Sequence, residues 1–262
     1  MINLISLGWG VQSWTLAAMV ALGDLPPVDV ALHSDTTWEM SSTYEFAKTW
    51  TPWLESRGVR VVTVGDATQP AAVTTLTTDI PAFTVGGSDK GGRLRRQCTS
   101  RWKIQPMRRW IGSELERRGL KKSPGAVSQW LGITTDEWHR AKDSDVRYIS
   151  HKYPLIDLGM SRADCINWLK SHDLPVPQKS SCTFCPFHNR RAWAEMRLAG
   201  GPDWEQAVAV DNAIRGVRPP YPLFVHSDRI PLEDAVVIPE MFGVEQLTMI
   251  PDDECDSGYC FL

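Results

Sequence analysis

The order of apolar and amphipathic segments in the N-terminal part of the sequence constrains the fold more than any other feature. Residues 2–6 form a short apolar run, and residues 14–22 carry apolar side chains at helical spacing. The same order returns with an apolar run at 28–33, a helical pattern at 42–55 and a third run at 59–64. Alternating strands and helices predict an α/β fold, in which a parallel sheet has helices on both faces.

The segment between the first strand and the first helix, Leu7-Gly8-Trp9-Gly10-Val11-Gln12-Ser13, predicts a phosphate-binding loop. Glycines let backbone amides approach phosphate oxygens, and the following helix N-terminus adds a partial positive charge. A Gly-x-Gly pattern alone equally describes a tight structural turn. The strand and helix on either side favour the ligand site, because parallel sheets bind ligands at the carboxyl ends of their strands. Asp35, after the second strand, falls at the same edge.

Three cysteines suggest a metal or cluster site. Cys98 stands alone, and Cys182 and Cys185 form a CxxC sequence about eighty residues later. A CxxC turn brings two thiolates to one metal ion, and a distant third thiolate ties another part of the chain to it. The uneven spacing of the six cysteines fits reduced thiols better than a disulfide scaffold. Cys165 falls on a predicted helix at 161–171 and is expected in the core.

Charge is locally concentrated although the chain as a whole carries a net charge of -3. A net charge of this sign gives no overall attraction to nucleic acid. The local cluster of basic residues is either a solvated face or an anion-binding site. The basic residues flank Cys98: Arg93, Arg95, Arg96, Arg101, Lys103, Arg108 and Arg109. Several of the twelve tryptophans lie beside basic residues, but their apolar neighbours favour packing in the core over stacking on bases.

Length and hydropathy indicate where the protein works and how large a core it buries. The 262 residues, 42% of them hydrophobic, suffice for one compact unit. No apolar stretch approaches the roughly 20 residues of a membrane span, and no basic signal region precedes the first strand. We therefore expect a cytoplasmic protein without a membrane contact.

Several segments together resemble the phosphoadenosine phosphosulfate (PAPS) reductase family, within the adenine nucleotide alpha-hydrolase-like or PP-loop superfamily. Ser6 to Ser13 is similar to the modified PP-loop of these reductases, with Gly10-Val11-Gln12 in place of the acidic SGGxDS form. The segment from Ser34 to Glu39 is similar to the family's Asp-Thr-Gly segment, with Thr37 replacing the glycine. Residues 96–107 resemble its Cys-x4-Lys-x2-Pro-Leu stretch. Loss of the PP-loop aspartate argues against magnesium-ATP cleavage more than against binding of an adenine nucleotide.

The resemblance implies a Rossmann-like PP-loop domain over residues 1–218, which includes the metal-cluster cysteines, and a C-terminal extension over 219–262 that serves as an active-site lid or tail. Leu131-Gly132-Ile133 and Asp136-Glu137-x-x-Arg140 also resemble a recurring family segment, whose ordinary role is structural. The tail contains Glu254-Cys255 as in the reductases, but lacks their Gly-Leu-His and adds Cys260.

The resemblance also implies roles for individual residues. The nucleotide-binding set is Ser6, Gly8, Gly10, Gln12, Ser13, Asp35 and Thr36. Anion binding falls to Arg96, Arg101 and Arg140, and the catalytic residues are Cys255 and Lys103. The metal ligands are Cys98, Cys182 and Cys185, which would hold an iron-sulfur cluster of the 4Fe-4S type or, alternatively, zinc. The fourth ligand stays open among Cys255, Cys260 and His188.

Three functions follow as hypotheses. The first is a sulfonucleotide reductase-like oxidoreductase that binds PAPS or APS and uses a reductant such as thioredoxin. The second is an ATP-dependent PP-loop sulfurtransferase or adenylating enzyme, with magnesium as an optional cofactor, acting on a nucleobase, a nucleic acid or a carrier. The third is a nucleotide-binding protein with structural zinc. A homo-oligomer is compatible with each hypothesis.

Overall fold

The computed structural model describes residues 1–65, 79–86 and 91–237, and these form two compact units. The first unit contains residues 1–35, 42–65 and 103–180. The second contains residues 36–41 and 181–237, together with the described residues between 79 and 102. The predicted boundary at residue 218 falls inside the second unit. Cys255 and Cys260 lie outside the described residues.

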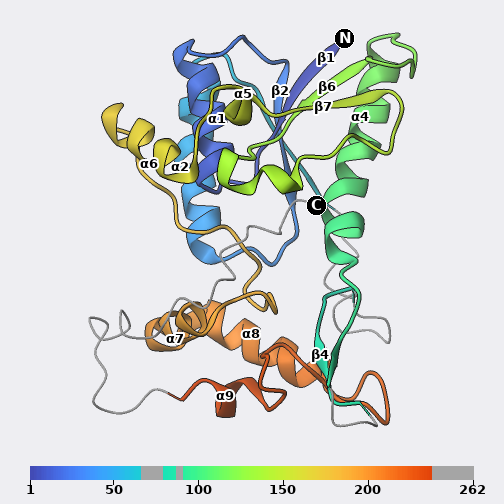
Figure 1. Ribbon diagram of the computed structural model, residues 1–262, viewed down its shortest axis with the longest axis vertical. Helices are drawn as coiled ribbons and strands as arrows, with labels where there is room; N and C mark the ends of the chain where they lie inside the picture. The colour runs from blue at the N-terminus through green and yellow to red at the C-terminus, as the bar shows by residue number, and fades with distance from the viewer. Residues whose placement is uncertain (66–78, 87–90, 238–262) are drawn as a thin grey trace. The chain divides into compact units, whose positions relative to one another are not determined.

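The first unit is built on a five-stranded parallel sheet, as the alternating pattern predicted (Figure 1). Its strand order is β3-β2-β1-β6-β7, and every neighbouring pair is parallel. The strands are β1 (Ile2–Ser6), β2 (Val30–Asp35), β3 (Val61–Gly65), β6 (Val127–Trp130) and β7 (Ile149–Lys152). The strand order reverses between β1 and β6. The carboxyl ends of these two strands therefore form the switch point, where such sheets bind ligands.

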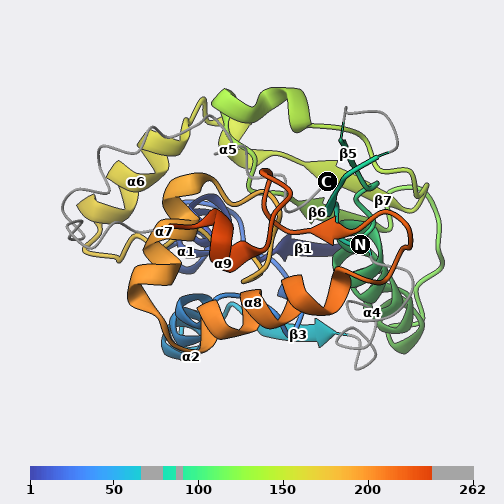
Figure 2. The same cartoon turned by 90° about the horizontal axis from the view of Figure 1, so that it is seen from below.

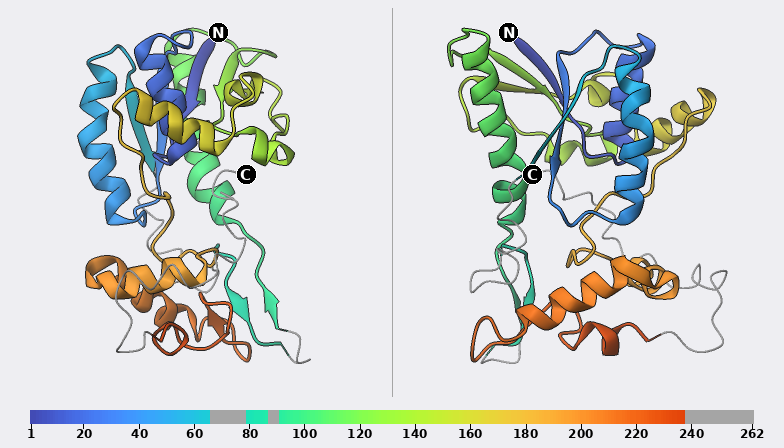
Figure 3. Two further views of the ribbon diagram at one scale, coloured as in Figure 1. Left: turned by 60° about the vertical axis from the view of Figure 1, so that its left-hand side comes forward. Right: turned by 180° about the vertical axis from the view of Figure 1, so that it is seen from behind.

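Helices cover both faces of this sheet, and the alternation of side chains along the strands explains why. Ile5 and Ala31 point into a core formed with α1, α2 and α6, whereas Leu4 and Leu32 point into a second core under α4. Figure 3 shows α4 and the α1–α2 pair on opposite sides of the strands. The helices are α1 (Val11–Leu22), α2 (Ser41–Glu55), α4 (Gln105–Arg117), α5 (Pro154–Asp157) and α6 (Arg162–Ser171).

Two helix predictions have different outcomes. Ser161 caps α6 with a complete capping box, in which Ser161 and Asp164 bond to each other's backbone N–H, so this prediction is confirmed. The sequence also predicts a helix capped by Thr134 or Thr135, but the structure has a 3-10 segment there, Thr135–Arg140, with non-helical angles at Glu137. Trp138 on this segment is 69% exposed, unlike Trp14, which is fully buried among aromatic rings.

Cys165 is buried in the core as predicted, and burial raises the pKa of its thiol to about 12.

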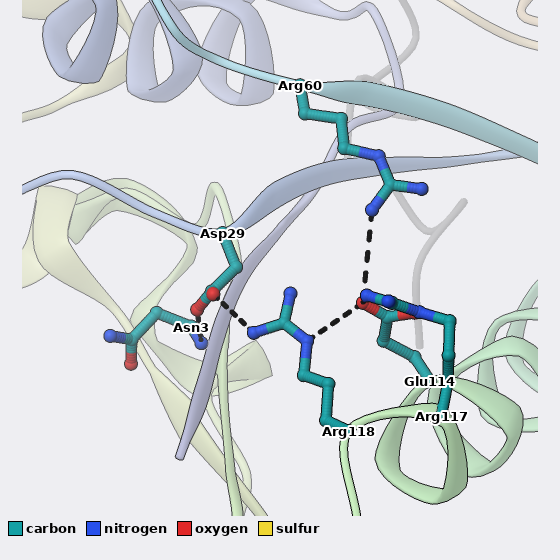
Figure 4. Close-up of polar contacts among 6 residues, drawn as sticks. All are labelled: Asn3, Asp29, Arg60, Glu114, Arg117 and Arg118. Atoms are coloured by element: carbon teal, nitrogen blue, oxygen red, sulfur yellow. Dashed lines mark hydrogen bonds and ion pairs between the residues drawn. The ribbon is translucent and has the colours of Figure 1, made fainter.

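A charged network fastens the C-terminal end of α4 to the amino ends of β1 and β2 (Figure 4). The buried carboxylate of Glu114 accepts hydrogen bonds from Arg117 at 2.7 Å and from Arg118 Nε at 2.9 Å. Arg118 Nη1 also contacts Asp29 Oδ1 at 2.6 Å, and Asp29 accepts from the backbone N–H of Asn3. The network therefore stabilises the sheet edge opposite the carboxyl ends of the strands.

The second unit has its own core and a small antiparallel sheet, β5-β4-β8. Its strands are β4 (Phe83–Thr84), β5 (Gly92–Arg93) and β8 (Leu223–Phe224), and its helices are α7 (Arg190–Ala199), α8 (Gly201–Ile214) and α9 (Leu232–Ala235). Figure 2 labels β5, α7, α8 and α9, and Figure 1 labels β4. The strand β4 is central and pairs with β5 on one side and with β8 on the other. A π-helical segment, Thr99–Ile104, precedes α4.

Part of the predicted C-terminal extension packs in this second core. Leu223, Val225, Leu232 and Val236 are buried there, next to Trp193. The buried carboxylate of Asp211 on α8 accepts hydrogen bonds from the backbone N–H of Val225 at 2.9 Å and of Leu232 at 3.1 Å. Residues 219–237 are therefore part of a packed unit. None of the helices among the described residues combines the length and apolar character needed to cross a membrane.

The Glu114 network predicts a loss of stability in the variant Glu114→Gln. The hydrogen bonds from Arg117, together with those from Arg118, lower the pKa of Glu114 from 4.5 to about 2. Removing its charge should cost about 1 to 3 kcal/mol in the free energy of unfolding at neutral pH, measured by urea denaturation.

The pH dependence of this effect has a definite sign. A carboxyl group whose pKa is depressed on folding stabilises the protein above its ordinary pKa of 4.5, and this contribution is lost as the pH falls toward 2. The stability difference between wild type and Glu114→Gln should shrink over that range. Glu116→Gln is the matched control, since the exposed Glu116 lies on the same helix and, within the described residues, forms an ion pair only with Lys122, at 3.9 Å. Equal losses in the two variants would contradict the assignment.

Candidate functional site

The loop between β1 and α1 is held in shape by its own side chains. Ser13 Oγ accepts a hydrogen bond from the Gly8 N–H at 3.1 Å and donates to the Gly10 carbonyl at 3.2 Å. Trp9 has a positive φ of 58°, a strained value for a bulky residue, and its ring is buried against Trp14 and Phe46. Core packing therefore fixes the loop in a conformation that an isolated chain would rarely adopt.

The N-terminus of α1 has no side-chain cap among the described residues. Gly10 occupies the N-cap position. The first N–H groups of a helix have no partner inside the helix, and they favour an anion. A Cβ atom at Gly10 would lie 3.1 Å from Ser180 Oγ, so glycine suits the close packing here.

Gly132, two residues after the end of β6, packs closely against this loop. A Cβ atom on Gly132 would lie 2.8 Å from the Ser13 nitrogen and 2.9 Å from the Gln12 carbonyl carbon. Both are backbone atoms, which cannot move aside as a flexible side chain would. The segment after β6 and the loop after β1 are therefore in direct contact at the switch point of the sheet.

A polar cluster extends from Gln12 of the loop. Gln12 Nε2 donates to Glu137 Oε2 at 3.3 Å, and Gln12 Oε1 accepts from Arg162 Nη1 at 3.3 Å. Glu137 Oε2 also pairs with Arg140 Nη1 at 2.8 Å. One carboxylate thus orients both the loop amide and a guanidinium group that is only 4% exposed.

Two buried polar atoms of this segment lack hydrogen-bond partners in the part of the chain that the structure describes. They are Arg140 Nε and Thr134 Oγ1, two to eight residues after Gly132. Buried polar atoms are nearly always paired, so these two atoms are candidate partners for an acceptor such as a phosphate oxygen. The sequence pointed to Arg140 as an anion ligand and to Thr134 only as a helix cap.

The other predicted nucleotide-binding residues have varied surroundings. Asp35 ends β2, and its Oδ1 accepts a hydrogen bond from the Tyr44 hydroxyl at 2.8 Å. Ser6 ends β1, and its Oγ accepts from Gln129 Nε2 of β6 at 2.7 Å, which joins the two strands of the switch point. Gly8, Gly10, Gln12 and Ser13 lie together in the loop, whereas Thr36 belongs to the second unit.

The three predicted metal ligands all belong to the second unit. Cys98 donates its backbone N–H to the Asp79 carbonyl at 2.8 Å, and Cys182 forms an isolated bridge with Glu39. The Cys182 Sγ atom lies 3.4 Å from Thr36 Oγ1, and Thr36 in turn donates to Glu39 Oε1 at 3.1 Å. Thr36 therefore contacts a cysteine in this structure.

Donor chemistry at these thiols suits a soft metal, but the geometry does not assemble a site. Among the described residues, no three side chains of His, Cys, Asp or Glu come together in a group that could hold a metal ion. His188 places Nε2 2.9 Å from the Cys182 carbonyl oxygen and packs its ring on Trp193. The fourth-ligand candidates Cys255 and Cys260 lie outside the described residues, so the ligand set stays a prediction.

The remaining charged candidates are divided between the two units. Arg101 Nη1 contacts the buried Asp79 Oδ1 at 2.6 Å, which the sequence did not predict. The Arg96 guanidinium lies over the ring of Phe187. Lys103 is buried near the end of the π-helical segment that leads into α4, and it belongs to the first unit.

Comparisons with known proteins do not establish a family for this chain. A scan against models of protein families gives no match, and a search of curated proteins gives none either. Among solved structures, the chain is similar to a phosphoadenylyl-sulfate (PAPS) reductase from Candida auris in a phosphate complex. The identity is 12% and the TM-score is 0.42, over 68% of this chain and 75% of that one. A likeness of this size is too weak to assign an activity.

The contact at Gly132 predicts that Gly132→Ala lowers stability. An added methyl group must displace the backbone of Gln12 and Ser13, at a cost of about 1 to 3 kcal/mol in the free energy of unfolding. Urea denaturation would measure it. Gly216→Ala is the control, because a Cβ atom there would meet nothing within 4 Å. A Gly132→Ala protein as stable as Gly216→Ala would contradict the close contact.

Proposed function

We propose that the chain is an enzyme that binds an adenine nucleotide at the switch point of its first unit and carries out sulfur chemistry, most nearly that of a sulfonucleotide reductase. One observation carries the proposal. The N-terminus of α1, which no described side chain caps, is joined through Gln12 and Glu137 to Arg140, whose buried Nε lacks a partner among the described residues. Both features favour a phosphate group.

Different residues would bind the phosphate and the nucleoside. The amides that follow Gly10 donate to its oxygens, and Arg140 supplies a positive charge that Glu137 holds in place. Asp35, oriented by the Tyr44 hydroxyl, is the candidate acceptor for a nucleoside hydroxyl. Gln12 cannot bind magnesium as an aspartate would, which favours nucleotide binding without ATP cleavage.

The sulfur step is proposed from the resemblance of the tail. The Cys255 thiolate attacks the sulfur of the sulfonucleotide, so that an S–S bond forms, the S–O bond to the phosphate breaks, and the nucleotide leaves. A dithiol reductant such as thioredoxin then reduces the S–S bond, becomes a disulfide itself and releases sulfite. Lys103, which belongs to the first unit, is the cation that would offset the charge of the phosphosulfate.

A nucleotide-binding measurement tests the proposal. Wild-type protein should bind ATP or adenosine 3',5'-bisphosphate in calorimetric titration, and Arg140→Gln should weaken binding by roughly tenfold or more, because a hydrogen bond to a charged group is lost. Arg147→Gln is the matched control, since Arg147 is an exposed arginine of the same unit. Absence of binding in wild type, or equal loss in both variants, would contradict the proposed site.

Thr134→Val separates ligand binding from folding. In the free protein the buried Thr134 hydroxyl lacks a partner among the described residues, so valine should leave the free energy of unfolding unchanged or raise it. With nucleotide present, the lost hydroxyl should lower affinity by about fivefold. A variant that loses stability without ligand would show that the hydroxyl has a structural role.

Metal content tests the cysteine set. We propose that anaerobically purified protein holds iron and acid-labile sulfide, or zinc, and that Cys98→Ala and Cys182→Ala lose it. Cys165→Ala is the control, because Cys165 is buried in the core of the other unit. Wild-type protein without metal would contradict the proposed metal site. Zinc without nucleotide turnover would favour the third hypothesis, a nucleotide-binding protein with structural zinc.

A further inference from the structure

The segment from Gly91 to Trp102 in the second unit concentrates positive charge. It contains four arginines and no acidic residue. Arg93 lies on β5 opposite Phe83 of β4, and the Leu94 N–H donates to the Ala82 carbonyl at 2.9 Å. Leu94 packs against the core of the unit, whereas its neighbours Arg93 and Arg95 are exposed. Strand alternation therefore directs these two side chains to solvent.

An aromatic ring holds two of these arginines. The Cζ atoms of Arg93 and Arg96 lie 4.7 Å and 5.4 Å from the ring centroid of Phe187. Phe187 follows Pro186, directly after the CxxC turn. A guanidinium group over a ring is held by its face, which leaves its N–H edges directed outward for anions. We call Arg93, Arg95, Arg96 and Phe187 the arginine–phenylalanine cluster.

Counter-charges at this cluster are missing from the described part of the chain. There, Arg93, Arg95 and Arg96 form no ion pair with a carboxylate, whereas the exposed arginines of α7 do. Arg190 pairs with Asp228 at 3.3 Å and Arg191 with Glu195 at 2.9 Å. Like charges gathered without acidic neighbours favour an external anion.

We propose that the arginine–phenylalanine cluster binds a single-stranded nucleic acid. Its guanidinium edges contact successive phosphates, and a base stacks on the flat surface that Phe187 and the guanidinium groups provide. A strand fits better than a single nucleotide, because the charges are distributed along a β-strand and the residues after it. The inference goes beyond the proposed function, because binding here uses the second unit alone.

The test is the affinity for a labelled single-stranded oligonucleotide of about 12 nucleotides, measured by fluorescence anisotropy between about 50 and 200 mM salt. Arg93→Ala/Arg95→Ala should make the slope of log affinity against log salt shallower by about 1.4, because two phosphate contacts are lost. Phe187→Leu should weaken binding by about fivefold or more through lost stacking and a released guanidinium group.

Arg57→Ala is the matched control for this experiment. The Arg57 guanidinium lies 4.2 Å from the ring centroid of Trp53, so the variant also removes an arginine–aromatic contact, but in the first unit. Its oligonucleotide affinity should equal that of wild type. Equal weakening in Arg57→Ala, a slope unchanged in the double variant, or an undiminished affinity in Phe187→Leu would overturn the proposal.

Two further outcomes separate this inference from the proposed function. ATP at an equal phosphate concentration should not displace the oligonucleotide, and displacement would assign the cluster to small nucleotides instead. Arg93→Ala/Arg95→Ala should retain ATP binding. A wild-type protein that binds the oligonucleotide but not ATP would refute the proposed nucleotide site and leave the nucleic-acid surface intact.

Discussion

The contact between Gly132 and the backbone of Gln12 and Ser13 is the constraint on which the candidate site depends. It brings the segment after β6 within van der Waals distance of the loop after β1, where the strand order reverses. Only a residue without a side chain permits this approach. Glu137 and Arg140 lie within eight residues of this glycine. The contact therefore brings Glu137 within hydrogen-bonding distance of Gln12, and Glu137 in turn positions Arg140.

Paired and unpaired polar groups lie at opposite edges of the same sheet. The Glu114 network joins α4 to the amino ends of β1 and β2, with its charges paired (Figure 4). At the carboxyl edge, the N-terminus of α1 has no side-chain cap among the described residues, and Arg140 Nε has no partner there. Polar groups without partners at the carboxyl edge, next to paired groups at the amino edge, are typical of a binding site at the carboxyl edge.

Local patterns were enough to predict much of the fold. The first three strands, the helices that follow two of them and the Ser161 cap were all found from periodicity and end signals, because these are properties of neighbouring residues. Contacts between distant residues could not be found this way. Glu137 and Gln12 are 125 residues apart, and Asp79 beside Arg101 has no local signature. Trp138 was missed as an exposed residue, since a 3-10 segment replaces the expected helix.

The central claim is that the loop after β1 and the segment after β6 bind the same phosphate. Hydrogen exchange of the backbone amides, with and without adenine nucleotide, tests it most directly. The account predicts slower exchange in both Val11–Ser13 and Gly132–Arg140 on addition of nucleotide, with no change at Arg117 and Arg118 on the opposite edge. Protection confined to the loop, or protection of neither segment under conditions where nucleotide is bound, would contradict it.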